Sequence, residues 1–469
     1  MLTLHAVVAT EIRIPTITDV RYHLDMEQSM KNAARVYESV LSHGQEGIDR
    51  YYAELRTIGI TPTPQEQPGF LFAPNPVVLP RAIVETITRD LQDFCAARLR
   101  ETPDAETLIS TMPSALRPMF GQPEIATRIL QDLHDTPPNA CLDCFLTETS
   151  EGLKPAYLEW QTFPAYYVTA VHCLEAINRA YPGISEAGGF FSPIRGETLV
   201  ELRNRVRRSL LKGIEDDPRQ GVIVDFEPEH QETAFEFHLQ VAMSGGLKNG
   251  LGVIDPREVI YQDGRPHYKR EGQMIPIRSV FSRLVHGDIE SRLLPALSAA
   301  ETETLTRFFN ETEHVAWRVH PLHFLYGTKG DFPRFHEQSL SKFIPACETI
   351  SPETIQKFRD ENITKLQGKV QKPIEGHGGR DVVENPAVDE LEVGALLQDR
   401  IHPASHHQTL HGDMTPEIRI MAIPDDDGRL VCTSVFTRVK GPHEFRSNAG
   451  AIAARDIPGT GEGYALIVD

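Results

Sequence analysis

The stretch Lys372-Pro-Ile-Glu-Gly-His-Gly-Gly379 decides how this chain is interpreted, because it joins a lysine and a carboxylate to a glycine-rich turn. Glycine has no Cβ, so the backbone N–H groups of such a turn can approach phosphate oxygens closely. Lys372 supplies a point charge for phosphate, and Glu375 is a ligand type that suits the Mg²⁺ accompanying ATP. Taken alone, a glycine cluster is more often a plain turn, and the chain has neither a Walker motif nor a convincing dinucleotide fingerprint.

The bulk composition narrows the class of protein. A chain of 469 residues is long enough for two or three packed domains, and 40% hydrophobic with 24% charged residues is ordinary for a globular protein. The formal net charge is −19, so the chain lacks the excess of basic residues that nucleic-acid binders usually have. The basic run 203–212 fits the solvated side of an amphipathic helix. No run approaches a membrane span, and residues 1–15 lack the pattern of a signal peptide, so we expect a cytoplasmic protein.

Two groups of cysteines and histidines could either bind a metal ion or be ordinary structural residues. Cys141 and Cys144 form a CxxC pair, but a structural zinc site needs a second pair or two histidines, and no second CxxC exists. We interpret them as half-buried thiols on a strand, with zinc or redox use as the alternative. Four histidines crowd one segment without a cysteine or carboxylate at firm ligand spacing, which favours solvated loop residues over a metal site: His402, His406, His407 and His411.

Hydrophobic periodicity predicts the order of elements. Residues 21–43 and 80–98 have apolar side chains at helical spacing. Residues 140–147 and 154–163 read as the two strands of a hairpin, and residues 221–256 read as strand, helix and strand. The pattern predicts four parts: a mostly helical N-terminal region (1–135), a part that contains the hairpin (136–220), an α/β subdomain (221–320), and a last part in which helices, turns and a second hairpin alternate (321–469).

A Lys-Pro before a glycine-rich loop, followed by a long antiparallel hairpin at 417–439, resembles the ATP-grasp ligases. In those enzymes two α/β lobes close on ATP. The order of the motifs resembles the circularly permuted branch, eukaryotic-type glutathione synthetase, and the resemblance extends in outline over residues 70–469. It implies an α/β (α+β) ATP-grasp fold, circularly permuted, with a helical N-terminal part and an inserted α/β substrate subdomain. The resemblance also implies a metal-binding strand in the first part of the core (136–220), substrate binding by the subdomain (221–320), and nucleotide-binding lobes with a lid (321–469).

Two motifs resemble the family's metal and phosphate sites. In YLEWQTF, Glu159 and Gln161 match a Glu-x-Asn metal pair, with glutamine lengthening the second arm by one methylene. Lys329 in HFLYGTKGDF matches a lysine that reaches the nucleotide phosphates. Lys372 and Glu375 match the phosphate lysine and metal-binding glutamate of the glycine-rich loop, although their spacing resembles the bacterial type as much. The loop glycines implied in nucleotide binding are Gly376, Gly378 and Gly379.

The resemblance also implies nucleotide and substrate contacts. Glu417 matches the carboxylate that binds ribose hydroxyls, and Arg446 matches an arginine that holds the substrate carboxylate. Arg283 is an additional candidate for substrate binding, because FSRLV reads as a strand that feeds the cleft. The segment LLQDRIHP resembles the linker strand whose backbone grips adenine, at positions Gln398, Asp399, Arg400 and Ile401.

The activity implied by the resemblance is an ADP-forming carboxylate–amine ligase that uses ATP and Mg²⁺. Lys372 and Arg446 would act catalytically by neutralising charge on phosphate and on the substrate carboxylate or oxyanion. The expected partners are small-molecule amino acids or short peptides, in a homodimer. A glutathione-type substrate and a different amino-acid or peptide pair are both open. The alternatives are a kinase-like phosphotransferase on the same fold and a non-catalytic nucleotide-binding protein.

Overall fold

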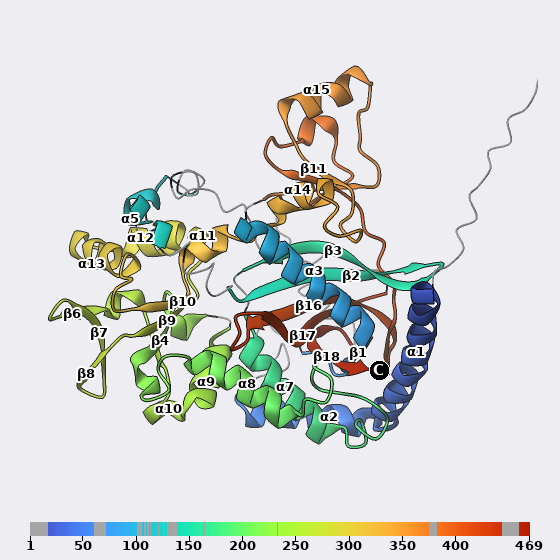
Figure 1. Cartoon of the computed structure of the whole chain (residues 1–469), viewed down its shortest axis with the longest axis horizontal. Helices are drawn as coiled ribbons and strands as arrows, with labels where there is room; N and C mark the ends of the chain where they lie inside the picture. Colours follow the sequence, from blue (N-terminus) through green and yellow to red (C-terminus); the bar gives the residue numbers. More distant parts are fainter. Residues whose placement is uncertain are drawn as a thin grey trace, which may run out of the picture.

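The computed structural model describes the chain except for residues 1–16, 61–71, 375–381 and 443–458, most of 101–137, and residues 163–164 and 232. Three groups of elements form around separate sheets (Figure 1). The largest sheet, in the described part of the chain, has seven strands in the order β1-β18-β17-β16-β2-β3, with β15 paired to β16. The strands are β1 (Val77–Pro80), β2 (Ala140–Thr149), β3 (Gly152–Gln161), β15 (His407–Thr409), β16 (Gly412–Pro424), β17 (Leu430–Lys440) and β18 (Gly461–Val468).

Helices cover both faces of this large sheet. The helix α3 (Arg81–Arg100) crosses one face, as Figure 1 shows, because its residues Ile83, Ile87 and Leu91 recur at helical spacing and are buried. The opposite face packs against α7 (Tyr167–Ala180), together with α1 (Ile17–Ser42) and α2 (Gly44–Thr57). The helices predicted over 21–43 and 80–98 and the hairpin predicted over 140–163 are therefore confirmed.

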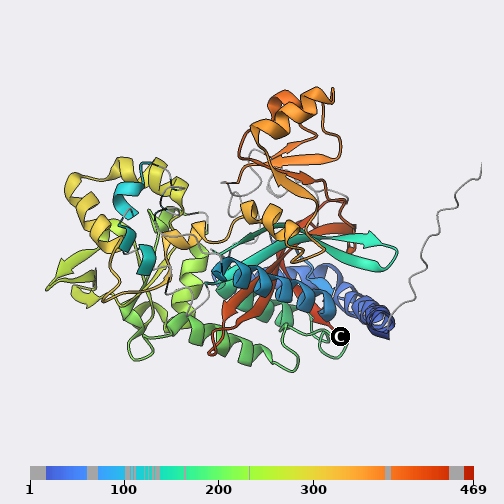
Figure 2. The ribbon, with the colours of Figure 1, turned by 45° about the horizontal axis from the view of Figure 1, so that its top comes forward.

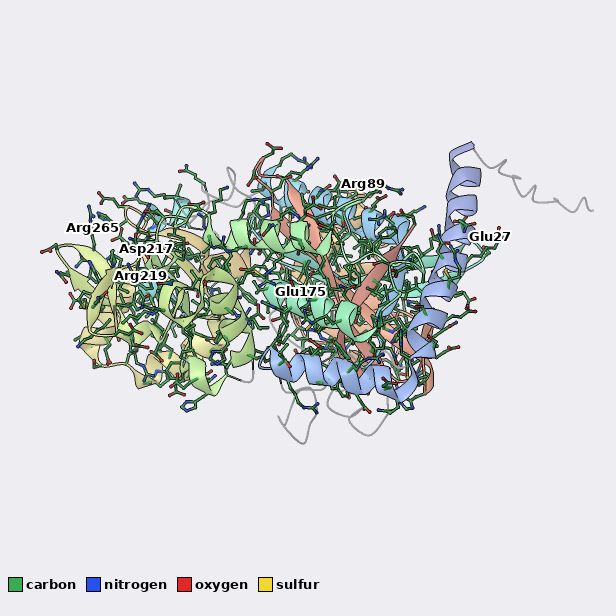
Figure 3. The ribbon with its side chains drawn as sticks, turned by 90° about the horizontal axis from the view of Figure 1, so that it is seen from below. Glu27, Arg89, Glu175, Asp217, Arg219 and Arg265 are labelled. Atoms are coloured by element: carbon green, nitrogen blue, oxygen red, sulfur yellow. The ribbon has the colours of Figure 1, made fainter. Side chains whose placement is uncertain are left out.

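The outer side of α7 is polar. Glu175, labelled in Figure 3, accepts a hydrogen bond at 2.8 Å from the Nη1 atom of Arg203 on α8 (Leu199–Leu211). The apolar side of α8 buries Leu202, Val206 and Leu210. The basic run therefore lies on an amphipathic helix, as predicted. None of the described helices is long and apolar enough to cross a membrane.

The second group is a four-stranded parallel sheet in the order β10-β9-β4-β5. It confirms the strand, helix and strand predicted from residue 221. After β4 the chain goes first to β5 on one side and later to β9 on the other, so the strand order reverses between β4 and β9. Ligands of open α/β sheets bind where such a reversal occurs, beyond the carboxyl ends of the strands. The elements are β4 (Gly221–Val224), α9 (Ala234–Ser244), β5 (Gly252–Ile254), β9 (Ser279–Ser282) and β10 (Ala316–Val319), with a small sheet of β6 (Ile260–Gln262), β7 (Arg265–Arg270) and β8 (Gln273–Pro276).

The third group stands off the large sheet, as the orange segment in Figure 2 shows. Its antiparallel sheet has the order β11-β14-β12-β13. The helix α15 (Pro352–Asp360) lies over a small apolar cluster and has no buried residue of its own. The strands are β11 (Cys347–Thr349), β12 (Lys369–Lys372), β13 (Val383–Glu384) and β14 (Leu396–Asp399). Further helices are α5 (Arg117–Phe120), α10 (Gly246–Asn249), α11 (His286–Asp288), α12 (Leu294–Ala296), α13 (Ala299–Phe309) and α14 (Phe332–Glu337).

The two cysteines of the CxxC pair are fully buried, so the half-buried state expected of them is wrong. Cys141 packs in the apolar cluster on the α7 side of the large sheet, whereas Cys144 packs in the cluster on the α3 side. Successive strand residues alternate between faces, and a separation of three places the thiols on opposite sides. One metal ion cannot be held by both thiols in this arrangement.

The histidine segment is only partly solvated. His402 and His411 are exposed as expected, but His407 is fully buried and its Nδ1 lies 3.2 Å from the hydroxyl of Tyr37 on α1. The expectation of a solvated loop is therefore wrong for His407, which starts β15. Among the residues that the structure describes, no group of three His, Cys, Asp or Glu side chains is arranged to hold a metal ion.

Candidate active site

Charged side chains gather on the α7 side of the large sheet. Directly opposed residues of neighbouring antiparallel strands point to the same face, so the strand register shows which side chains meet. The register aligns two rows of charge, Glu159–Asp143–Arg419 and Glu417–Arg438–Glu462. Buried charges are costly unless they are paired and hydrogen-bonded, and such costly groups are typical of functional sites.

Arg419 and Asp143 form a two-pronged ion pair in the first row. The Nε of Arg419 donates to Oδ1 of Asp143 at 2.6 Å, and its Nη2 donates to Oδ2. Asp143 is 1% exposed and Arg419 is 7% exposed. Burial raises the pKa of Asp143 to about 6 and Arg419 acts against that rise, so the carboxyl is ionised at neutral pH. The Nη2 of Arg419 also lies 3.7 Å from Glu159 Oε1, which carries the network to β3.

Glu417 anchors two cations in the second row. Its Oε2 accepts from Lys440 Nζ at 2.6 Å, and its Oε1 accepts from Arg438 Nη1. Both oxygens of this side chain, which is 2% exposed, are thus occupied within the protein. Each oxygen accepts from one cation, so Glu417 positions Arg438 and Lys440. The contact of Glu417 with ribose hydroxyls stays a prediction.

The pairing of Glu417 predicts a pH-dependent loss of stability. Burial alone would raise the pKa of Glu417, but Lys440 and Arg438 outweigh it and lower the pKa to about 2, below the usual 4.5. A lowered folded-state pKa stabilises the fold above pH 4.5, and the contribution disappears as the pH falls towards 2. We expect Glu417→Gln to reduce the free energy of unfolding by about 3 kcal/mol at pH 7. Urea unfolding between pH 7 and pH 3 should show this difference shrinking; a constant difference would contradict the ion pairs.

The two predicted phosphate lysines meet the predicted metal glutamate. Lys329 Nζ lies 3.7 Å from Glu159 Oε2, and Lys329 is 8% exposed. Lys372, at the end of β12, donates from Nζ to Gln398 Oε1 at 2.6 Å and to the carbonyl of Leu158 at 3.3 Å. The third sheet therefore contacts β3 through Lys372. Burial lowers the pKa of Lys372 to about 8, while Glu159 acts to raise it.

Close contacts explain the glycines on either side of Thr328-Lys329. A Cβ at Gly327 would lie 2.7 Å from Thr162 Cγ2, and one at Gly330 would lie 2.9 Å from Ile374 Cγ2. The first glycine lets this turn approach the end of β3, and the second lets it approach the residues after β12. The sequence Gly-Thr-Lys-Gly thus brings Lys329 to the junction of the large and third sheets.

Gln161 and Glu159 share a face of β3, since they are two residues apart on one strand. Glu159 is 28% exposed and Gln161 is partly exposed, so their oxygens are accessible at the sheet edge. Carboxylate and amide oxygens are ligand types that suit Mg²⁺. With two lysines beside Glu159, the residues present fit a magnesium–phosphate group.

The predicted adenine linker forms β14 and the residues after it. The side chain of Gln398 is occupied by Lys372. Asp399 pairs with Lys369 at 2.7 Å, Arg400 pairs with Glu384 at 3.4 Å, and Ile401 is buried. Their side chains therefore serve the third sheet.

Arg283 belongs to the second group of elements and lies directly after β9. Its backbone N–H donates to the carbonyl of Val224, and its Nε has no hydrogen-bond partner among the described residues. Arg283 acts to lower the pKa values of Asp225 and Glu236, whose burial raises them, so these carboxyls are its electrostatic neighbours. Arg283 stands where the strand order reverses.

Five predicted site residues lie outside the described residues: Glu375, Gly376, Gly378, Gly379 and Arg446.

Several residues of the charged face were not predicted from the sequence. Charges two residues apart within hydrophobic strands were the available signal, in Glu417-Ile-Arg419 and in Arg438-Val-Lys440. Period two places each pair on one face of a strand. Only the strand pairing, however, reveals that these faces meet Asp143 and Glu462.

No family model matches this chain, and no curated protein matches it in sequence. In structure the chain is similar to a glutathione synthetase-like effector from Globodera pallida in its apo form, with a TM-score of 0.50 and 12% sequence identity. The match covers 90% of this chain and 96% of that chain. This chain has a glutathione synthetase-like fold. The likeness confirms the predicted resemblance at the level of a mixed α/β fold with several sheets, and the circular permutation stays a prediction.

Proposed function

We propose that this protein is an ATP-dependent carboxylate–amine ligase of the ATP-grasp type, which forms an amide bond through an acyl phosphate. The observation that carries the proposal is the meeting of Lys329, Lys372 and Glu159 at one edge of the large sheet. Two cations and an accessible carboxylate, supplied by three segments far apart in sequence, suit a triphosphate with its metal ion.

A free carboxylate is a poor electrophile, so an amide needs an activated acyl group. In the proposed reaction the substrate carboxylate attacks the γ-phosphoryl group of ATP, and ADP leaves with the electrons of the broken P–O bond. An amine then displaces phosphate from the acyl carbon of the resulting acyl phosphate. Lys329 and Lys372 bind phosphate oxygens and offset their charge. Glu159, Gln161 and Glu375 would hold Mg²⁺, which reduces the repulsion between the carboxylate and the triphosphate.

The substrate end of the proposal is the switch point of the second sheet. Arg283 would bind a substrate carboxylate there, because it lies beyond the carboxyl end of β9 with an unpaired Nε. Arg446 would hold a carboxylate or oxyanion at the reacting centre. The backbone from Gln398 to Ile401 would grip adenine. In this scheme residues 221–320 bind the substrate and residues 136–220 and 321–469 bind the nucleotide.

A coupled assay of ADP and phosphate release from Mg-ATP tests the ligase. We expect release to require two substrates from a panel of amino acids and dipeptides, one carrying the carboxylate and one the amine. Glu159→Gln should lower the rate by about 100-fold and raise the Mg²⁺ concentration that is needed, because a neutral amide binds the metal more weakly. Glu151→Gln, in the exposed turn of the same hairpin, is the matched control and should stay close to wild type.

Other outcomes would change the assignment. ADP release with one hydroxylated acceptor and no amine would identify a phosphotransferase instead. An absence of both turnover and ATP binding, the latter measured by calorimetry, would overturn the nucleotide assignment. Equal losses in the two variants would show that the effect does not arise at the proposed metal site.

A further inference from the structure

Glu462 differs from the other carboxylates of the charged face. It lies on β18 opposite Arg438, and its Oε1 is 3.9 Å from Arg438 Nε, beyond hydrogen-bonding distance. Its Oε2 is buried and has no hydrogen-bond partner among the described residues. Asp143 and Glu417 both have their two oxygens engaged by cations. Among the carboxylates of the two rows, Glu462 therefore has a buried oxygen without a hydrogen-bond donor among the described residues.

Its position joins the two ends of the proposed site. Tyr166 stacks on Phe436 of β17 at 5.4 Å and on Phe235 of α9 at 6.0 Å, so this ring bridges the large sheet and the second group. Its backbone has φ of 73°, a costly conformation for an aromatic residue, and its N–H donates to the carboxylate of Glu236. Glu462 on the large sheet and Glu236 and Arg283 in the second group all act electrostatically on the hydroxyl of this ring, so the Tyr166 side chain lies near charges of both groups.

The surroundings of Glu462 make its carboxyl group a weaker acid than an exposed glutamic acid. Burial raises its pKa to about 7, and the opposing influence of Arg438 and Arg419 is only partial. A carboxyl group with a pKa close to the working pH is suited to accepting and returning a proton. The titratable and charged groups that face it are Arg438, Arg419, Glu417, Tyr166, Tyr464 and Cys173.

A ligase of the proposed kind needs such a group, because an amino group arrives as ammonium and has no free electron pair. We propose that Glu462 receives this ammonium group and takes its proton through the unused Oε2, an inference that rests on the proposed function. The N–H electron pair stays on nitrogen and forms the bond to the acyl carbon. The bond between that carbon and the phosphate oxygen breaks, and phosphate leaves with the bonding electrons. The departing phosphate takes the second nitrogen-bound proton, and Glu462 returns its proton to water.

Hydroxylamine separates this proton transfer from carboxylate activation. It is largely uncharged at neutral pH and attacks acyl phosphates without a base, giving a hydroxamate. With ATP and the panel of amino acids and γ-glutamyl dipeptides, Glu462→Gln should lose amide formation by about 100-fold or more. Hydroxamate formation should change less than about threefold, because activation does not use Glu462. Glu462→Asp should recover part of the amide rate, since the carboxyl remains.

The outcomes distinguish the two levels of the proposal. Equal losses of amide and hydroxamate in Glu462→Gln would overturn the proton-transfer role and leave the ligase. Full amide formation by this variant would overturn it as well. A wild-type protein that forms no ATP-dependent hydroxamate with any carboxylate would overturn the proposed function itself.

Stability provides a readout that needs no substrate. The folded-state pKa of Glu462, about 7, lies above the usual 4.5, so the stability that the protonated carboxyl contributes is present below 4.5 and is lost as the pH rises to 7. Glu462→Gln removes the charge and keeps the shape. Its melting temperature relative to wild type should therefore increase between pH 5 and pH 8. A relative melting temperature that does not depend on pH would contradict the perturbed carboxyl and overturn the proposal.

Discussion

Replacing Lys372 with methionine should lower ATP-dependent phosphate release by about 1,000-fold, while the protein remains folded. Methionine keeps most of the length of the side chain and removes the charge that we assign to phosphate binding. The Nζ of Lys372 is held by Gln398 and by the carbonyl of Leu158, so the wild-type charge is fixed in place beside Glu159. The variant leaves Gln398 Oε1 without its donor, which should cost about 1–3 kcal/mol.

The same strand provides the control for this prediction. Lys369 is one-third exposed and pairs with Asp399 at 2.7 Å, and its separation of three residues from Lys372 places it on the other face of β12. Lys369→Met should therefore retain activity close to wild type.

In the wild-type protein, ATP affinity should fall as the pH rises past about 8, because the ammonium form of Lys372 is then lost. Calorimetric titration should show this pH dependence in wild type and not in Lys372→Met; full phosphate release by the latter would refute the role.

The lysine end of the candidate site is predictable from the sequence because its signals are local. Gly327 and Gly330 flank Lys329 for a steric reason that a short motif can carry, since each is in close contact with another segment. Lys372 is marked by the Pro and glycines that follow it. The hairpins were predictable for the same reason, because period-two alternation and turn residues occur within a few positions of each other.

The charged face was not predictable, because its partners are distant in sequence. Arg419 and Asp143 are separated by 276 positions and meet only because β16 pairs with β2. Alternation indicates that Arg419 and Glu417 share a face, but it does not reveal that the face opposes other charges. The same limit explains His407, whose burial depends on packing against Tyr37 on α1.

Breaking the Asp143–Arg419 pair should have the largest effect on stability. Removing one partner strands the other charge in a buried position, which typically costs about 3–5 kcal/mol. We therefore expect Asp143→Asn and Arg419→Met each to lower the free energy of unfolding by about that amount. The protein has two tryptophans. Trp160 on β3 would report the unfolding of the large sheet by fluorescence once Trp317 on β10 has been replaced with phenylalanine.

Matched variants separate the cost of a stranded charge from the value of the pair. Arg429→Met removes an ion pair from the exposed turn between β16 and β17, 3.4 Å from Asp425, and should cost less than about 1 kcal/mol. The double variant Asp143→Leu with Arg419→Met should recover much of the stability lost in the single variants, because apolar side chains can replace a buried pair at little cost. If that double variant folds and binds ATP but cannot form amide, the pair is retained for the reaction: Arg419 reaches Glu159 and influences Glu462 from the same face of the sheet. If it forms amide at the wild-type rate, the charged row serves the fold alone, and the chemistry belongs to Lys329, Lys372 and their neighbours.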